Sequence, residues 1–254
     1  MTPFDIGLLF LAAVLSGALN SVAGGGSFIS FPALIFTGVP ATFANATSTV
    51  ALWPGSVASA GAYRDHLGDR RRHLLAVGVS LIGGILGAVL LIRTPQATFV
   101  HLVPYLLLLA TVLFAFGGKA AVWLRSRTHR LTGPPWLSFG GIVVAQLAIA
   151  TYGGYFGGGI GILMLAVLAL AGLENIHQMN AVKTLLATCI NGVAVLVFVV
   201  AGTVIWPKAL LMIVGAILGG YFGAHYARRV DPLLVRRFAL AVAVVMTAFF
   251  FLRG

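Results

Sequence analysis

Residues 19–34 read LNSVAGGGSFISFPAL and residues 155–162 read YFGGGIGI, and each stretch contains a glycine triplet directly after a long apolar run. The two copies lie 133 residues apart in a chain of 254. Three glycines in a row lack side-chain bulk and favour non-helical backbone, so each triplet predicts a break before the next helix. The two triplets are Gly24, Gly25, Gly26 and Gly157, Gly158, Gly159.

Other matches follow the triplets at nearly the same spacing. The matched pairs are Asn45 with Asn180, Gly83 with Gly219, and Pro95 with Pro232. The spacing rises only from 133 to 137 residues, as small loop insertions would produce. In an apolar chain, an internal repeat of this length indicates a transporter made of two related halves.

The composition places the chain in a membrane. Hydrophobic residues make up 60% of the chain and charged residues only 8%, whereas a soluble domain carries about 25% charged residues. The net charge of +11 resides in short loops, where it sets topology and contacts anionic lipid rather than nucleic acid. The single cysteine, Cys189, excludes an internal disulfide and a zinc cluster. We therefore expect an all-α polytopic membrane protein.

The apolar pattern predicts ten segments, five in each half. They are 4–22, 27–39, 41–63, 74–92 and 99–124, then 136–155, 160–173, 177–201, 207–226 and 235–252. The second segment of each half follows a glycine triplet and is too short to cross a bilayer core of about 30 Å. This divides the chain into a first repeat (1–124), a basic linker (125–135) and a second repeat (136–254).

Loop arginines predict that the two halves have opposite orientations. In the first half they follow the third segment, and in the second half they follow the fourth. The first group is Arg64, Arg70, Arg71 and Arg72; the second is Arg228, Arg229, Arg236 and Arg237. Because basic loops stay in the cytoplasm, this exchange predicts two inverted five-segment repeats with the linker inside and both termini outside.

The glycine breaks predict an anion site. A helix that begins inside the protein presents unpaired N–H groups and the positive end of its dipole. The two expected starts are Ser27, which adds a hydroxyl, and Ile160, which does not. In inverted-repeat transporters such helix ends converge near the midplane on anionic groups.

The third segment of each half adds polar groups. Asn45 and Ser48 share a helix face in one half, as do Asn180 and Lys183 in the other. Lys183 fits either contact with the substrate anion or extension of its ammonium to the outer interface. Two further amides lie in apolar runs and fit either ligand contact or hydrogen bonding between helices. These are Asn20 and Asn191.

The carboxylates all fall in loops or at segment ends, so none is expected to carry a proton or sodium in the membrane. No metal-ligand spacing and no nucleophile–base pattern is evident, so we expect no catalytic residues, no metal and no cofactor. Helix N-termini, one lysine and no carboxylate together favour an anion. A negative cell interior would drive such an anion outward without a coupling ion.

The glycine stretches, together with NATSTVAL (45–52) and NAVKT (180–184), resemble the TauE/SafE family of sulfite and organosulfonate exporters over nearly the whole chain. The resemblance implies a permease of the bacterial inner membrane for anions such as sulfite or sulfoacetate. An anion channel with the same site remains the alternative to an alternating-access carrier, whereas an enzyme lacks catalytic groups. The expected partners are the small anion and the lipid bilayer, with a homodimer as an open option and no nucleic acid.

Overall fold

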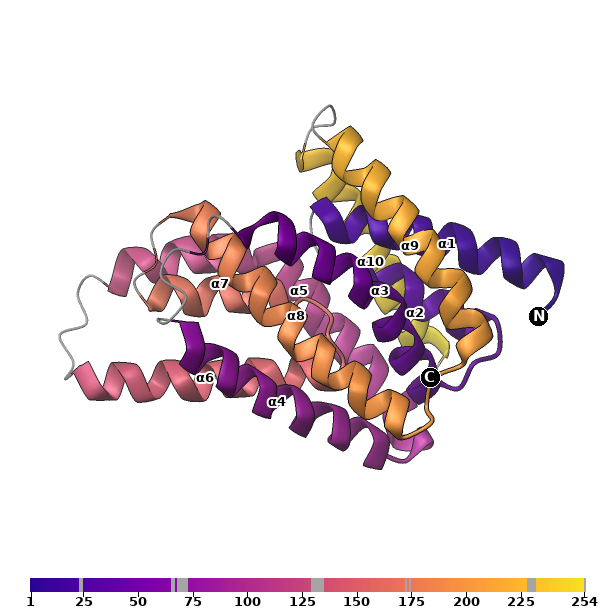
Figure 1. Cartoon of the computed structure of the whole chain (residues 1–254), viewed down its shortest axis with the longest axis horizontal. Coiled ribbons are helices and arrows are strands. Elements are labelled where there is room, and N and C mark those ends of the chain that lie inside the picture. The colour runs from indigo at the N-terminus through magenta and orange to yellow at the C-terminus, as the bar shows by residue number, and fades with distance from the viewer. Residues whose placement is uncertain are drawn as a thin grey trace.

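The computed structural model is a bundle of ten helices (Figure 1). It describes residues 1–22, 25–64, 67, 73–128, 135–171, 173, 175–227 and 232–253. All regular structure in these ranges is helical, which confirms the all-α prediction. The helices are α1 (Pro3–Val22), α2 (Ser27–Phe36), α3 (Ala41–Ala62), α4 (Leu74–Arg93), α5 (Gln96–Thr128), α6 (Pro135–Tyr155), α7 (Ile160–Leu170), α8 (Ile176–Val200), α9 (Trp206–Ala227) and α10 (Pro232–Arg253).

Each predicted segment corresponds to one of these helices. The largest difference is at the linker, because α5 continues through Arg125 to Thr128. Helix α6 begins at Pro135, and residues 129–134 lie outside the described ranges. The described loop arginines include Arg64, whereas residues 68–72 and 228–231 are also outside these ranges. The exact boundary between the two repeats therefore stays a prediction.

The predicted breaks at the glycine triplets are confirmed. In the first half, α1 ends at Val22 and α2 begins at Ser27. Gly25 has φ of +101°, a conformation that L side chains rarely adopt, while Gly24 lies outside the described residues. Helix α2 has only 10 residues, about 15 Å of helical rise, because Gly38 (φ +76°) follows its end.

The second break has the same character. Helix α6 ends at Tyr155 and α7 begins at Ile160. Gly157 and Gly159 have φ of +81° and +76°, so the α-helix cannot continue through them. Helix α7 has 11 residues. Both short helices therefore begin directly after a glycine break.

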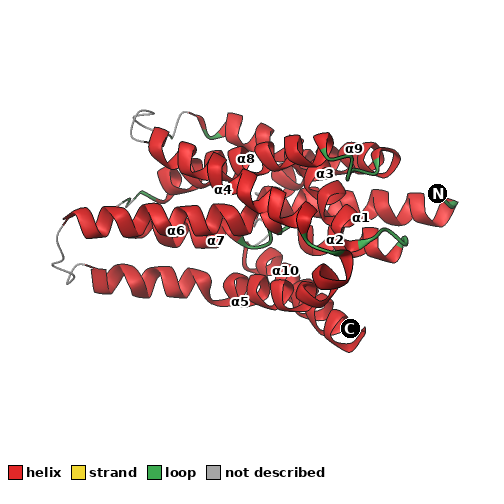
Figure 2. Ribbon diagram, turned by 90° about the horizontal axis from the view of Figure 1, so that it is seen from below, coloured by secondary structure: helices red, strands yellow, loops and turns green. Residues whose placement is uncertain are grey.

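The helices form two layers, a row of six helices and the pair α5 and α10. In the row, α3 and α8 pack against each other, α9 lies beside α3, and α4 lies beside α8. Helix α1 packs on α9, and α6 packs on α4. Helices α5 and α10 pair on one side of this row (Figure 2). The short helices join the layers, because α2 contacts α1, α3 and α10 while α7 contacts α6, α8 and α5.

This packing is symmetric when the two halves are exchanged. If α1–α5 are matched with α6–α10, the pair α1–α9 becomes α6–α4, and α3–α9 becomes α8–α4. All four of these helix contacts are present in the structure. The most extensive are the equivalent contacts α1–α9 and α4–α6. The two halves therefore interlock rather than sit side by side.

Glycines permit the two closest helix contacts. A β-carbon on Gly219 of α9 would overlap the Val14 carbonyl of α1, and one on Gly87 of α4 would overlap the Thr151 carbonyl of α6. Small residues allow membrane helices to approach backbone to backbone in this way. Gly219, which marks the repeat in the sequence, and Gly87 thus help to hold the two halves together.

The outer surface suits lipid. Large apolar side chains on α4 and α9, among them Leu86, Leu90 and Leu210, are each about half exposed. Within the described residues, four helices are long and apolar enough to span a membrane: parts of α1, α4, α5 and α8. Helix α3 is long enough but less apolar, because it contains several polar residues. Of these, Thr42, Asn45, Thr47 and Ser48 are buried in the protein. The chain is therefore a multi-pass helical membrane protein.

Gly87→Ala should destabilise the protein, whereas Gly78→Ala in the same helix should not. The new methyl group at position 87 would collide with the α6 backbone, whereas no described residue lies within 4 Å of one at position 78. Overpacking of this kind costs about 1–3 kcal/mol. Thermal unfolding in detergent should show a lower midpoint for Gly87→Ala alone, and equal midpoints would contradict the contact.

Candidate functional site

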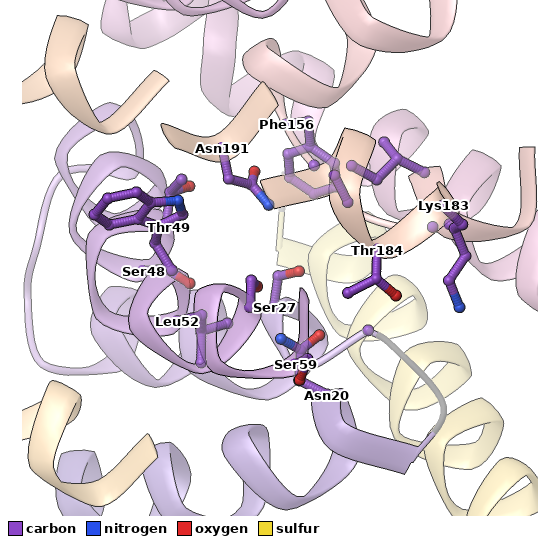
Figure 3. A pocket seen from close by; sticks show the side chains of 18 of the residues that line it. Asn20, Ser27, Ser48, Thr49, Leu52, Ser59, Phe156, Lys183, Thr184 and Asn191 are labelled. Carbon is purple, nitrogen blue, oxygen red and sulfur yellow. The ribbon is translucent and has the colours of Figure 1, made fainter. Parts of the chain in front are cut away.

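A cavity of about 280 Å³ lies where the two broken helices meet α3 and α8 (Figure 3). The polar ends of Ser48, Ser27 and Asn191 point into the same space, and Lys183 lies at its edge. Its lining comprises Asn20, Gly25, Ser27, Ser48, Thr49, Leu52, Trp53, Ser56, Ser59, Tyr63, Phe156, Gly157, Gly159, Ile160, Gly161, Leu165, Asn180, Lys183, Thr184, Ala187 and Asn191.

The first residues of α2 and α7, Ser27 and Ile160, both line this cavity. No described side chain caps either helix at its N-terminus, and at α2 the Phe28 and Ile29 N–H groups donate to the Gly25 and Gly26 carbonyls, both at 3.0 Å. The N–H groups of a first helical turn have no partner within the helix, and the dipole is positive there. The cavity is therefore bordered by two helix ends that favour negative charge.

Hydrogen bonds fix the start of α2. The Ser30 hydroxyl lies 3.2 Å from the Gly26 carbonyl and 2.6 Å from the Ser48 hydroxyl of α3. Ser30 and Ser48 are both almost fully buried. A β-carbon on Gly26 would overlap the backbone of Ser16 in α1, so only glycine fits here. The break is thus clamped between α1 and α3.

The start of α7 is held by the end of α6. The Tyr152 hydroxyl donates to the Gly158 carbonyl at 2.8 Å, across the turn of the break. The Asn45 amide of α3 donates to the Tyr155 carbonyl at 2.9 Å. This carbonyl belongs to the last residue of α6 and has no helical partner of its own. Asn45 therefore stabilises the end of a helix from the other half.

Lys183 is the one charged side chain among the described residues of the lining. Its ammonium donates to the Asn180 amide oxygen at 3.1 Å, and no carboxylate lies in the lining. Its stem passes over the first turn of α7, because a β-carbon on Gly161 would lie 3.3 Å from Lys183 Cδ. The lysine charge thus adds to the positive end of the α7 dipole.

Comparison with known proteins shows the family of the chain. The model of the family described as "Sulfite exporter TauE/SafE" matches residues 9–250. The chain belongs to the TauE/SafE family. The resemblance seen in the glycine motifs is thereby confirmed.

Among its relatives is "Probable membrane transporter protein YfcA" of Escherichia coli K12, 28% identical over 98% of this chain and 90% of that protein. A "Probable membrane transporter protein" of Haemophilus influenzae is 29% identical, covering 96% and 93% of the two chains. No solved structure matches the chain significantly. This TauE/SafE protein is a multi-pass membrane transporter and not an enzyme.

Most predicted site residues of this TauE/SafE protein line the cavity. They are Asn20, Gly25, Ser27, Ser48, Gly157, Gly159, Asn180, Lys183 and Asn191. Gly26 and Gly158 shape the two breaks without lining the cavity, and Gly24 lies outside the described residues. Asn45 is not in the lining either, because its amide is used by the Tyr155 carbonyl.

Several residues of the lining were not predicted from the sequence. Trp53 and Ser56 share the helix face of Thr49 on α3, and their positions could have been found from the repeat. Ser56 is the counterpart of Asn191, 135 residues away. Trp53 Nε1 donates to the Thr188 carbonyl at 3.1 Å across the contact between α3 and α8. Phe156 was not predicted to line the site, because an aromatic residue beside a glycine triplet does not by itself indicate a ligand contact.

Asn45→Leu should destabilise the protein more than Asn191→Leu. The first change leaves the Tyr155 carbonyl without its donor in a buried site, which costs about 1–3 kcal/mol. The Asn191 amide faces the cavity and makes no hydrogen bond to any residue that the structure describes. Thermal unfolding of the two purified variants tests this difference. Equal decreases in the unfolding midpoint would show that Asn45 does not stabilise the end of α6.

Proposed function

We propose that this TauE/SafE protein exports small sulfur-containing anions, such as sulfite or sulfoacetate, from bacteria by alternating access around this cavity. One observation carries the proposal. Two helix N-termini without a described side-chain cap and Lys183 line one cavity, and its described lining holds no carboxylate. Such a site attracts anions and disfavours cations.

The donors suit a sulfonate or sulfite group. Its oxygens accept hydrogen bonds, and charge-assisted bonds to backbone N–H groups or an ammonium are the strongest of this kind. Gly25 and Gly159 bring bare backbone to the cavity, while the amides of Asn20 and Asn191 supply further donors. Leu52 and Phe156 form an apolar part of the wall, which fits the carbon portion of an organic sulfonate.

The charge of the site also fits export. A negative cell interior drives an anion outward with about 2.3 kcal/mol per charge per 100 mV. Export therefore needs no coupling cation. The absence of carboxylates from the described lining agrees with this, because cation-coupled transport usually uses acidic residues in the membrane.

We further propose that the two halves are inverted repeats in the inner membrane. Exchange of the halves preserves the helix packing, as a two-fold relation requires. Residues at or next to equivalent positions also meet. Trp53 bonds to its counterpart Thr188, and the Thr111 hydroxyl lies 3.0 Å from that of Thr247, one position before its counterpart. Both termini lie at one end of the bundle in Figure 2, which supports a shared periplasmic side. Association into a homodimer stays a prediction.

Lys183→Met should weaken sulfonate binding about 10- to 100-fold. The change removes the ammonium and its charge-assisted bonds, worth about 1.5–3 kcal/mol. The methionine retains an unbranched apolar stem beside Gly161. Calorimetric titration of the purified protein measures the affinity, after a thermal-shift screen of sulfite, sulfoacetate, taurine, thiosulfate and sulfate has selected the ligand.

Lys183→Arg is the matched control, because it retains the charge and should keep most of the affinity. Thermal unfolding of both variants shows whether the fold is intact. Unchanged affinity in Lys183→Met would remove this residue from the site.

Flux through proteoliposomes separates a carrier from a channel with the same site. A carrier must rearrange once per ion, and such motions take microseconds to milliseconds or longer. We expect saturable flux that Lys183→Met reduces. Flux that does not saturate and far exceeds this cycling rate would instead indicate a channel.

A further inference from the structure

We infer that the cavity is open to the cytoplasm in this structure, and that the opposite path is closed by hydrogen bonds between the α8–α9 connection and helices α2 and α3. The inference rests on the proposed alternating access. It assigns positioning roles to Lys208 and Thr47, which lie outside the cavity lining.

The cavity extends along α3 to the C-terminal end of this helix, and we take this end as its open side. Its lining includes Ser59 and Tyr63, in the last turn of the helix and at its end. Tyr63 is 39% exposed, so the cavity reaches the surface of the bundle here. The chain continues with Arg64 into the arginine-rich connection that the sequence places in the cytoplasm.

The repeat identifies the corresponding positions on the other side. Ser59 and Tyr63 correspond to Ala194 and Phe198 of α8, 135 residues further along. Both of these side chains are 0% exposed and belong to the hydrophobic core. Two equivalent stretches of helix are therefore in opposite states: one lines the cavity and the other is sealed.

The asparagines show the same contrast. Asn180 lines the cavity and binds the Lys183 ammonium, whereas its counterpart Asn45 is 2% exposed and bound to the Tyr155 carbonyl. Exchange of these states between the halves would open the path beside Asn45 and close the one beside Asn180. This exchange is the expected motion of inverted repeats about a fixed site.

Two contacts close the sealed side. The Lys208 ammonium, at the start of α9, donates to the carbonyl and the hydroxyl of Thr37, both at 2.9 Å. Thr37 follows the last residue of α2, so the cation also faces the negative end of that helix. Beside it, the Ile205 N–H donates to the Thr47 hydroxyl of α3 at 3.1 Å.

These contacts join the two halves of the chain. Helices α2 and α3 belong to the first half, and the connection at 201–205 and helix α9 belong to the second. Opening the sealed side must separate them. Three hydrogen bonds and part of the packing between α3 and α9 would be lost in this step.

Cysteine accessibility tests the inference. In a Cys189→Ala background, Ser59→Cys and Ala194→Cys place single thiols at equivalent positions of the two paths. A membrane-impermeant maleimide is applied to whole cells and to inside-out vesicles. We expect Ser59→Cys to react rapidly from the cytoplasmic side only, and Ala194→Cys to react slowly and from the periplasmic side only.

Lys208→Met should accelerate periplasmic labelling of Ala194→Cys by about tenfold or more, because it removes the bonds to Thr37. Thr47→Val is a second, independent variant and should act in the same direction. Thr203→Val is the matched control, since the one hydrogen bond of its hydroxyl among the described residues is to the Phe198 carbonyl at the end of α8.

Labelling of Ala194→Cys from the cytoplasmic side would overturn the inference. Equal labelling rates with and without the Lys208 and Thr47 changes would overturn it as well. Neither result depends on the substrate, so the calorimetric titration of the Lys183 variants still judges the proposed anion site separately.

Discussion

The structure depends on one constraint: backbone that leaves the helical conformation inside a membrane must be buried in protein or face water. Two helices of this protein break at glycines with positive φ, and each break is followed by a short helix that begins at the same cavity. At the start of α2 the Phe28 and Ile29 N–H groups donate to the Gly25 and Gly26 carbonyls, and the other N–H groups of the two helix starts have no partner within the helix. The cavity lies at both helix starts, so the breaks and the candidate site are one feature of the fold.

The remaining helices hold the two breaks in place. Glycines on α4 and α9 bring these helices into backbone contact with α6 and α1, the helices that end at the breaks. Because each contact joins helices of different halves, the halves cannot separate without losing both. The repeat gives the two halves the same helix arrangement, but equivalent positions carry different side chains. Ser48 in one half corresponds to Lys183 in the other, and both line the cavity. The positive charge of the site therefore comes from one half only.

Local sequence was sufficient to predict the helices and their breaks. Apolar runs of sufficient length require helices in a bilayer, and the glycine triplets interrupt them regardless of what packs nearby. The same reasoning predicted that Ser27, Asn180 and Lys183 belong to the site, and all three line the cavity. Polar groups within a membrane segment cost free energy, so they often mark a functional site. These features depend on residues close together in the chain.

Tertiary structure alone decided how equivalent motifs differ. Asn45 and Asn180 occur in similar sequences, NATST and NAVKT, yet one caps the end of α6 and the other lies in the cavity. Likewise, Trp53 contributes to the site because α3 packs on α8, a contact between residues 135 positions apart. A single fold with related halves can hold them in different states, since burial depends on the packing between halves. The sequence specifies the repeat, and only the packed structure selects which copy is open.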